Sequence, residues 1–301
     1  MAEERNQEAL TAIEAALAGC PSAGFKARLR GELETTILMS TGASTLQAAR
    51  GIRRGFTAVT PYVVAADVEG LIAFIKRAFD GEETGRSSHG DGRLHCEMRI
   101  GDSMLMLGAG TPPKLAGFHM FVDDTDAVYR RAIDAGGESL GAPEDRPYGE
   151  RSGFVKDPAG NYWFIATRLG PSYFAEHPRT VTPHVYLQAQ SGKGAPEFIE
   201  FLKAAFGANL EMRHDFPDGR VGHALVHLAG AAIEMGEGHE PSPTGPAAFY
   251  LYVEDCDALY NQAVAAGAKS MYEPMDMPYG DRSGGVEDAW GNIWSISTHL
   301  A

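Results

Sequence analysis

The chain has 301 residues, of which 44% are hydrophobic, and this is enough to bury two ordinary cores. Its formal net charge of -14 at pH 7 excludes a broad phosphate-binding surface, because nucleic-acid binding draws on clustered lysine and arginine. We therefore expect a small molecule as the partner, and neither nucleic acid nor a membrane.

Residues 1–56 are predicted to form a helical arm followed by a linker. Apolar residues recur at helical spacing from about residue 2 to residue 39, with a break at Pro21, which predicts two amphipathic helices. The stripe that contains Phe25, Leu29 and Leu33 must pack either on the rest of the chain or on a second subunit in a homodimer. The segment 40–56 is rich in Gly, Ser, Ala and Arg and is interpreted as the linker.

The remainder contains two copies of one pattern, which we place at 57–172 and 178–301. A block that begins at Pro147, PYGERSGFVKDPAGNYWFIATR, returns at Pro278 as PYGDRSGGVEDAWGNIWSISTH. Each block predicts a turn at Tyr-Gly, an extended segment, a second turn that begins with Asp, and a closing strand with Trp163 or Trp294. A hairpin therefore ends each copy.

Each copy is predicted to contain two βαβββ units, which makes the fold α+β. In the first copy, helices are expected over 68–79 and 125–135, and a hairpin turns at Gly101-Asp102. The second copy repeats this order, with helices over 196–206 and 255–266. The hairpin registers place Glu97 opposite Met106 and Leu225 opposite Glu234. Alternation then directs one set of side chains away from the helices: His95, Glu97, His223, His227 and Glu234.

Three cysteines, Cys20, Cys96 and Cys256, have no motif spacing, so neither a disulfide framework nor a thiolate metal site is predicted. The first residues lack a basic-then-apolar signal pattern, and no stretch approaches the roughly 18 apolar residues of a membrane span. These features are typical of a reducing compartment, and we expect a cytoplasmic protein.

Four βαβββ units that end in Asp-Pro-x-Gly-Asn-x-Trp or a close variant resemble the vicinal-oxygen-chelate superfamily, which includes glyoxalase I, bleomycin-resistance proteins and extradiol dioxygenases. The closer likeness is to its PhnB-like branch, through Thr60-Pro61-Tyr62, residues 92–102, Thr182-Pro183-His184, residues 219–224 and the two Pro-Tyr-Gly blocks. The resemblance covers the chain from about residue 58 onward. It implies two tandem glyoxalase-like domains whose units curl into open, eight-stranded cups.

In that superfamily a metal ion, when present, is held by His or Gln on the first strand of a cup, Glu on the fourth, His on the fifth and Glu on the eighth. Carried over within each copy, these positions hold Thr60, Met106, His119 and Phe164, and then Thr182, Glu234, Tyr250 and Ser295. Only His119 and Glu234 match.

Cups built from the first unit of one copy and the second unit of the other would change this count. One cup would then hold His119 and Glu234 together with His184, which lies on the same strand face as Thr182. The resemblance thus implies His119, His184 and Glu234 as candidate metal ligands, with Glu234 as the catalytic proton carrier. Whether the cups form within or between the copies stays open at this point.

Further side chains are candidate ligand contacts in the cups: His95, Glu97, His223, His227, Tyr250, Trp163, Trp294, Arg151 and Arg282. The alternative for the tryptophans is a place in the core. The alternative for the arginines is a loop held by the pairs Glu150/Arg151 and Asp281/Arg282 in each cup mouth.

Two functions from different classes remain. The eroded ligand sets favour a protein that binds a small molecule in its cups without a full metal site, as antibiotic-resistance members of the superfamily do. The alternative is a metal-dependent lyase, isomerase or dioxygenase with one active cup that uses a single Zn, Ni, Fe or Mn ion. The sequence does not decide whether the protein is an enzyme.

Overall fold

The computed structural model describes residues 51–88, 93–170, 179–188, 193–238 and 245–300. The chain divides into two compact units, residues 1–49 and 50–301, and the second unit holds all described residues. The predicted helical arm lies outside the described residues. Within them, no helix is both long enough and apolar enough to cross a membrane.

Four βαβββ units follow one another, as predicted, and the fold is α+β. The first unit comprises β1 (Val59–Ala65), α3 (Val68–Phe79), β2 (Glu82–Ser88), β3 (Leu94–Ile100) and β4 (Ser103–Ala109). The second comprises β5 (Gly117–Phe121), α4 (Thr125–Asp134), β6 (Glu138–Arg146), β7 (Glu150–Lys156) and β8 (Tyr162–Arg168). The third comprises β9 (Val181–Leu187), α5 (Ala195–Phe206), β10 (Asn209–Asp215), β11 (Val221–Leu228) and β12 (Ala231–Glu237). The fourth comprises β13 (Ala248–Tyr252), α6 (Cys256–Ala265), β14 (Lys269–Asp276), β15 (Asp281–Glu287) and β16 (Ile293–His299).

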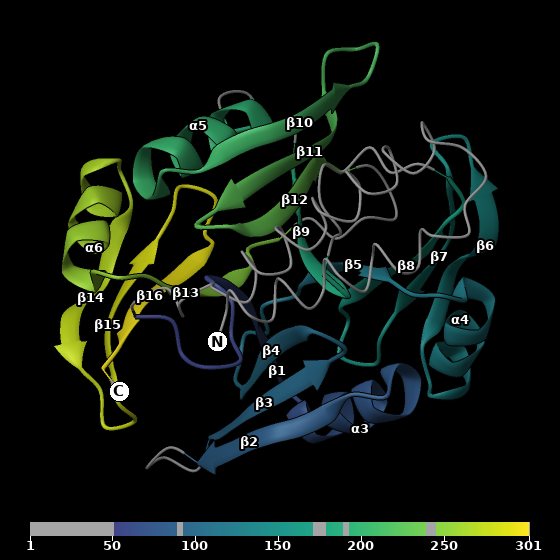
Figure 1. The fold of residues 1–301 in the computed structure, drawn as a ribbon, viewed down its shortest axis with the longest axis horizontal. Helices are drawn as coiled ribbons and strands as arrows, with labels where there is room; N and C mark the ends of the chain where they lie inside the picture. The colour runs from purple at the N-terminus through teal and green to yellow at the C-terminus, as the bar shows by residue number, and fades with distance from the viewer. Residues whose placement is uncertain (1–50, 89–92, 171–178, 189–192, 239–244, 301) are drawn as a thin grey trace, which may run out of the picture. The chain divides into compact units, whose positions relative to one another are not determined.

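The two eight-stranded sheets are each shared between the copies (Figure 1). One sheet has the order β10-β11-β12-β9-β5-β8-β7-β6, and we call it the first cup. The other has the order β14-β15-β16-β13-β1-β4-β3-β2, and we call it the second cup. The junctions are antiparallel, with Thr182 opposite His119 in the first cup and Thr60 opposite Tyr250 in the second. The cups therefore form between the copies, which is the arrangement that brings His119 and Glu234 into one sheet.

The hydrophobic cores, by contrast, lie almost entirely within the copies. Helix α3 packs beside α4, and α5 packs beside α6 (Figure 1). Phe74, Phe118 and Trp163 belong to the core of the first copy, whereas Phe198 and Trp294 belong to the core of the second. Each copy thus keeps its own core while it contributes four strands to each sheet.

Strand register decides which side chains enter the cups. Glu97 lies opposite Met106, and Leu225 lies opposite Glu234, as predicted. Cys96, which precedes Glu97, is fully buried in the core under the helices, so the alternation of a strand directs Glu97 into the second cup. In the parallel pair β9–β12, His184 lies opposite Glu234, which places both on the inner face of the first cup.

The turn that closes each copy is built around a buried aspartate. Asp157 accepts hydrogen bonds from the main-chain nitrogens of Ala159 and Asn161 and from Nε1 of Trp163, each at 2.9 Å. Asp288 makes the same bonds in the second copy, with Trp294 as the indole donor at 2.9 Å. The two tryptophans are 1% and 0% exposed. They lie in the cores, as the structural alternative predicted, and do not line a cup.

Candidate functional site

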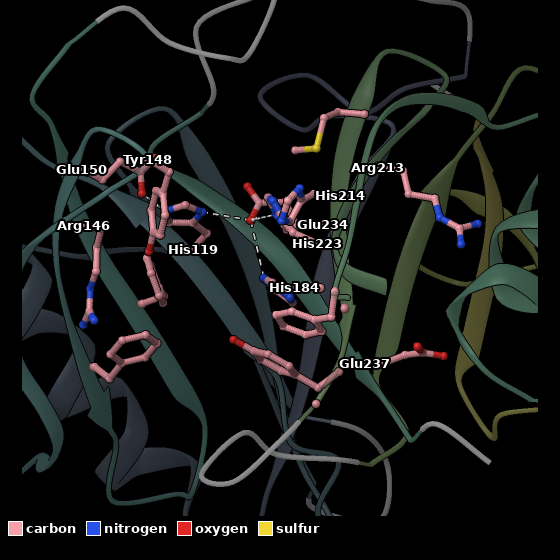
Figure 2. Close-up of a pocket in the computed structure, with 18 of the residues that line it drawn as sticks. His119, Arg146, Tyr148, Glu150, His184, Arg213, His214, His223, Glu234 and Glu237 are labelled. Atoms are coloured by element: carbon pink, nitrogen blue, oxygen red, sulfur yellow. Dashed lines mark hydrogen bonds and ion pairs between the residues drawn. The ribbon is translucent and has the colours of Figure 1, made fainter. Parts of the chain in front are cut away.

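The first cup encloses a cavity of about 810 Å³ whose walls come from both copies. Arg146, Tyr148 and Glu150 lie on one side of it, and Arg213 and His214 lie on the other (Figure 2). Aromatic side chains supply much of the remaining wall: Phe154, Phe164, Tyr186 and Phe216. A cavity of this size and character suits a small organic molecule.

Three imidazoles converge on one carboxylate oxygen in this cavity. Oε2 of Glu234 lies 2.9 Å from Nδ1 of His119, 3.5 Å from Nδ1 of His184 and 3.3 Å from Nε2 of His223 (Figure 2). Glu234 is 1% exposed, and its Oε1 has no hydrogen-bond partner among the described residues. The structure therefore brings the three predicted metal ligands together, and His223, predicted as a ligand contact, joins them.

Burial and charge together set the protonation of this cluster. Burial alone lowers the pKa of His119, but the carboxylates of Glu234 and Glu150 raise it to about 9. Burial also lowers the pKa of His184, and this effect outweighs the nearby carboxylate. For Glu234, burial acts to raise the pKa, but the three imidazoles hold it well below its usual range. At neutral pH the cluster thus contains a charged His119, a neutral His184 and an ionised Glu234.

Glu150 belongs to the same cluster, and the sequence analysis missed it. It is 2% exposed at the start of β7, and its Oε2 lies 3.5 Å from Nε2 of His119. Glu150 and Arg151, which the structural alternative assigned together to a loop in the cup mouth, point to opposite faces of the strand because they are adjacent. Arg151 instead donates to Asp126 at 2.9 Å and to Asp145 at 2.8 Å. Alternation along 150–156 was the signal that could have placed Glu150 in the cup.

The second cup is filled by the segment that precedes it. Ile52 and Phe56 pack against a cluster formed by Met106, Tyr250 and Tyr252. Arg53 forms an ion pair with Glu97, in which Nη2 lies 3.2 Å from Oε2. Residues 51–56, which were predicted as part of a linker, are therefore an inner element of the second cup.

Three of the predicted ligand contacts, His95, Glu97 and Tyr250, lie in this second cup. Nδ1 of His95 lies 3.2 Å from the hydroxyl of Tyr62. Tyr250 donates its hydroxyl to Asp281 at 2.7 Å. Met106 and Tyr250 occupy the positions that Glu234 and His119 occupy in the first cup. The second cup therefore has a thioether in place of the carboxylate and a phenol in place of the imidazole.

His227 and Arg282 also lie apart from the cavity of the first cup. His227 forms an ion pair with Glu211. Arg282 donates to Asp257 of α6 at 2.7 Å and to Asp276 of β14 at 3.0 Å, just as Arg151 joins α4 to β6. The two arginines thus tie a helix to a strand, which accounts for their recurrence in both copies.

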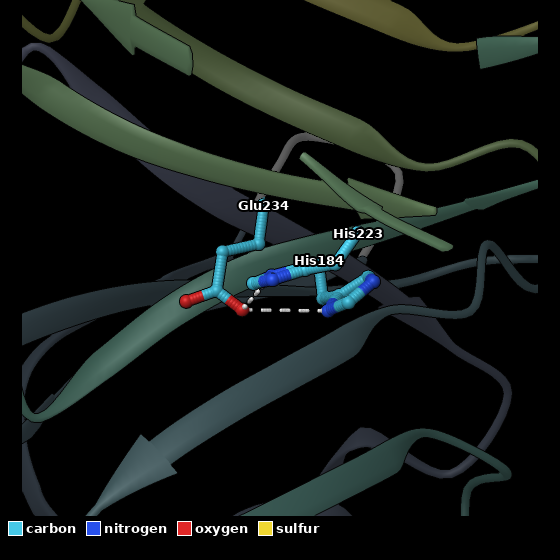
Figure 3. Close-up of side chains that lie close together, drawn as sticks. All are labelled: His184, His223 and Glu234. Atoms are coloured by element: carbon cyan, nitrogen blue, oxygen red, sulfur yellow. Dashed lines mark hydrogen bonds and ion pairs between the residues drawn. The ribbon is translucent and has the colours of Figure 1, made fainter. Parts of the chain in front are cut away.

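The residues of the first cup fit a divalent metal ion. Imidazole nitrogen and carboxylate oxygen are the ligand atoms that such ions take in proteins, and one from each of His184, His223 and Glu234 lies within 4.8 Å of the others (Figure 3). Ligand atoms bound tetrahedrally at 2.0–2.2 Å are about 3.4 Å apart, which agrees with the 3.3 and 3.5 Å found here. Nε2 of His184 and Oε1 of Glu234 are buried without a partner in the described part of the chain, so the cluster has unused binding capacity.

Comparisons with known proteins agree with this architecture. The family model described as Glyoxalase/Bleomycin resistance protein/Dioxygenase superfamily matches residues 57–165 and 189–296. Mb0911c, an uncharacterized protein of Mycobacterium bovis, is 36% identical over 123 residues, which are 36% of this chain and 81% of that protein. "Putative glyoxylase CFP32" of the same organism is 26% identical over 194 residues, which are 62% of this chain and 70% of the relative.

Among solved structures, glyoxalase I from Zea mays aligns with a TM-score of 0.61 at 16% identity, over 80% of this chain and 92% of that chain. This likeness shows a common fold. The two family matches together cover most of the chain and coincide with the two copies. The chain therefore belongs to the glyoxalase/bleomycin resistance protein/dioxygenase superfamily.

Proposed function

We propose that the first cup is the active site of a metal-dependent enzyme of the glyoxalase type, a lyase, isomerase or dioxygenase that acts on a small oxygenated molecule. The observation that carries the proposal is the convergence of three imidazoles on one oxygen of the buried Glu234. Burying such charged groups costs several kcal/mol unless they are well paired, and among the described residues Nε2 of His119, Nε2 of His184 and Oε1 of Glu234 have no hydrogen-bond partner. This reverses the order that the sequence favoured, because His223 adds an imidazole to the incomplete ligand set.

In this proposal His184, His223 and Glu234 hold the ion, and His119 joins them when it gives up its Nδ1 proton. A divalent ion bound there would polarise neighbouring oxygens of the substrate and stabilise negative charge on them. Glu234 receives the three imidazoles on Oε2 alone. Its Oε1 is therefore left to accept a proton from the substrate and to return it.

The walls of the cavity would bind and orient the substrate. Phe154 and Phe164 pack edge to face with their ring centroids 4.3 Å apart, and both line the cavity. Such rings exclude water and contact the carbon skeleton of a bound molecule. They leave its oxygens to the polar cluster around Glu234.

A metal-free binding cup is the second candidate, and one observation favours it. His119 carries a positive charge between the carboxylates of Glu234 and Glu150, so part of the cluster's charge is balanced without an ion. The aromatic walls would then supply most of the affinity for a planar or hydrophobic compound. This is the function that the antibiotic-resistance members of the superfamily suggest.

Metal analysis of protein purified without chelators or a polyhistidine tag separates these candidates. We expect about one equivalent of divalent metal in the wild type, loss of the metal in Glu234→Gln and weaker binding in His184→Gln. His227→Gln is the matched control, because His227 lies outside the cavity, and it should retain its metal. If the wild type binds none of Zn²⁺, Ni²⁺, Mn²⁺ and Fe²⁺, the proposal of a metal-dependent enzyme is refuted. In a pure binding cup, Glu234→Gln should leave the affinity for an aromatic dye such as anilinonaphthalene sulfonate nearly intact.

Membership of the PhnB-like branch and a cytoplasmic location are also our proposals. The first rests on the motifs at Thr60-Pro61-Tyr62 and Thr182-Pro183-His184 and on the two Pro-Tyr-Gly blocks. The second rests on the cysteines, which have no motif spacing. We likewise keep the domain limits of 57–172 and 178–301, and a homodimer formed through residues 1–56, as proposals.

A further inference from the structure

Glu150 faces the side of His119 that is opposite to Glu234. Nδ1 of His119 lies 2.9 Å from Oε2 of Glu234, whereas Nε2 lies 3.5 Å from Oε2 of Glu150 (Figure 2). A good hydrogen bond is shorter, about 2.7–3.2 Å, but neither Nε2 nor this Oε2 has another hydrogen-bond partner among the described residues. One ring nitrogen therefore faces the candidate metal position, and the other faces a second buried carboxylate.

The second cup repeats this contact with different residues. Strand β13 pairs with β1 as β5 pairs with β9, which places Tyr250 at the position of His119, and Asp281 begins β15 as Glu150 begins β7. The hydroxyl of Tyr250 donates to Oδ2 of Asp281 at 2.7 Å. Tyr250 has the longer side chain and contacts the shorter acid, Asp281. His119 has the shorter side chain and faces the longer acid, Glu150. In both cups the acid thus faces the side chain at this position, with a hydrogen bond in the second cup and a 3.5 Å contact in the first.

The two acids differ in how fully they are paired. Asp281 also accepts from the hydroxyl of Tyr252 at 3.1 Å, and its Oδ1 lies 2.7 Å from Nδ1 of His299. In the first cup Phe121, two residues after His119, stands at the position of Tyr252, so this donor is missing. Among the described residues, Oε2 of Glu150 has no hydrogen-bond partner, and a buried carboxylate with few partners is costly.

We propose that Glu150 is a positioning residue that holds His119 in one tautomer and one orientation; its consequence for metal binding rests on the proposed function. A histidine that binds a metal ion generally donates its other ring N–H to a carboxylate, which fixes the ring. When an ion displaces the proton of Nδ1, Glu150 keeps Nε2–H on the far side of the ring, and the lone pair of Nδ1 points toward the ion. The acid of the Pro-Tyr-Gly block thus acts through His119 and is not itself a ligand.

The first test compares Glu150→Gln with Glu150→Asp and with Asp281→Asn, the matched change in the second cup. The affinity for Zn²⁺, measured by competition with a chelating dye, should fall about 10- to 100-fold in Glu150→Gln and less in Glu150→Asp. Asp281→Asn should bind Zn²⁺ as the wild type does, although it should unfold at a lower urea concentration. Unchanged Zn²⁺ affinity in Glu150→Gln would overturn the proposal. If that variant does not fold, Glu150→Asp carries the same test with a smaller expected loss.

A second readout distinguishes this inference from the proposed function. In metal-free protein labelled with ¹⁵N-histidine, Nε2–H of His119 should give an exchange-protected, low-field resonance, assigned by its loss in His119→Gln. The resonance should disappear in Glu150→Gln and persist in Asp281→Asn. If the wild type binds no Zn²⁺ but the resonance depends on Glu150, the proposed function fails and the positioning role stands. If Glu150→Gln leaves the resonance unchanged, the positioning role fails whatever the metal result.

Discussion

Replacing Asp157 by asparagine tests whether one carboxylate holds the turn that closes the first copy. Oδ1 accepts from the main-chain nitrogens of Ala159 and Asn161, and Oδ2 accepts from Nδ2 of Asn161 and Nε1 of Trp163, all at 2.9 Å. Asparagine keeps one acceptor oxygen and replaces the other by an amide group that cannot accept. If the amide takes the place of Oδ2, Nε1 of Trp163 loses its acceptor, and Nδ2 of Asn161 keeps only its longer bond to Oδ1 at 3.2 Å.

The size of the effect follows from the burial of those donors. Asn161 and Trp163 are each 1% exposed, so water does not replace the missing acceptor. A buried donor without an acceptor costs about 1–3 kcal/mol, and the weakened bond of Asn161 adds to this, so we expect a loss of about 2–3 kcal/mol in the free energy of unfolding. The side chain of Asn161 also accepts from the main-chain nitrogen of Ala116 at 3.0 Å, so the change should loosen the junction between this turn and β5.

Urea unfolding of the full chain measures this loss, and the second copy supplies an internal replicate. Asp288 has the same set of donors, including Nε1 of Trp294 and Nδ2 of Asn292 at 2.9 Å. Asp288→Asn should therefore lose a similar amount, whereas Asp218→Asn, at an exposed acid, should leave the midpoint of urea unfolding nearly unchanged. A loss below about 1 kcal/mol in both copies would show that the carboxylate does not organise the turn.

Two further variants test the second cup and the arginines. Arg53→Ala should lower the free energy of unfolding by about 1–2 kcal/mol, because it leaves Glu97 buried without its guanidinium while Arg53 itself is partly exposed. Glu97→Gln should lower the free energy of unfolding by less than Arg53→Ala does, since an amide costs less to bury than an unpaired carboxylate. A larger loss for Glu97→Gln in urea unfolding would contradict this account. Arg151→Ala should lower the midpoint of urea unfolding only slightly, because its ion pairs are exposed, and it should leave the metal content of the first cup unchanged. A loss of metal would show that Arg151 contributes to the site.

The element order and the strand registers could be predicted because they depend on local patterns. The two-residue turn at Gly101-Asp102 fixes the hairpin pairing, and Glu97 then lies opposite Met106. Alternation on either side of Glu234 placed its side chain on the face away from the helix, where the structure has it. The helix predicted over 68–79 spans the same residues in the structure.

The pairing of the cups could not be settled in this way. The junction strands β1, β5, β9 and β13 pair with strands distant in the sequence, and their local patterns are the same whether a cup forms within a copy or between copies. The filling of the second cup also lacked a signal, because Ile52 and Phe56 are two apolar residues without periodicity in a segment rich in glycine and arginine. Glu150 is different, because the sequence contained the information and the adjacent Arg151 gave a misleading partner.

The exchange of strands between the copies explains how one duplication produced two unlike cups. The first cup takes Glu234, His184 and His223 from the second copy and His119 from the first, whereas the second cup takes the complementary units. A substitution on the inner face of one unit therefore changes the lining of one cup only. The hydrophobic core lies on the other face of the sheet, within each copy. The segment 51–56 leads directly into β1, a strand of the second cup, so it can fill that cup without approaching the other. The cup that lacks the imidazole and carboxylate of His119 and Glu234 is thus also the cup that residues 51–56 fill, whereas the described residues around the polar cluster of the first cup line a cavity.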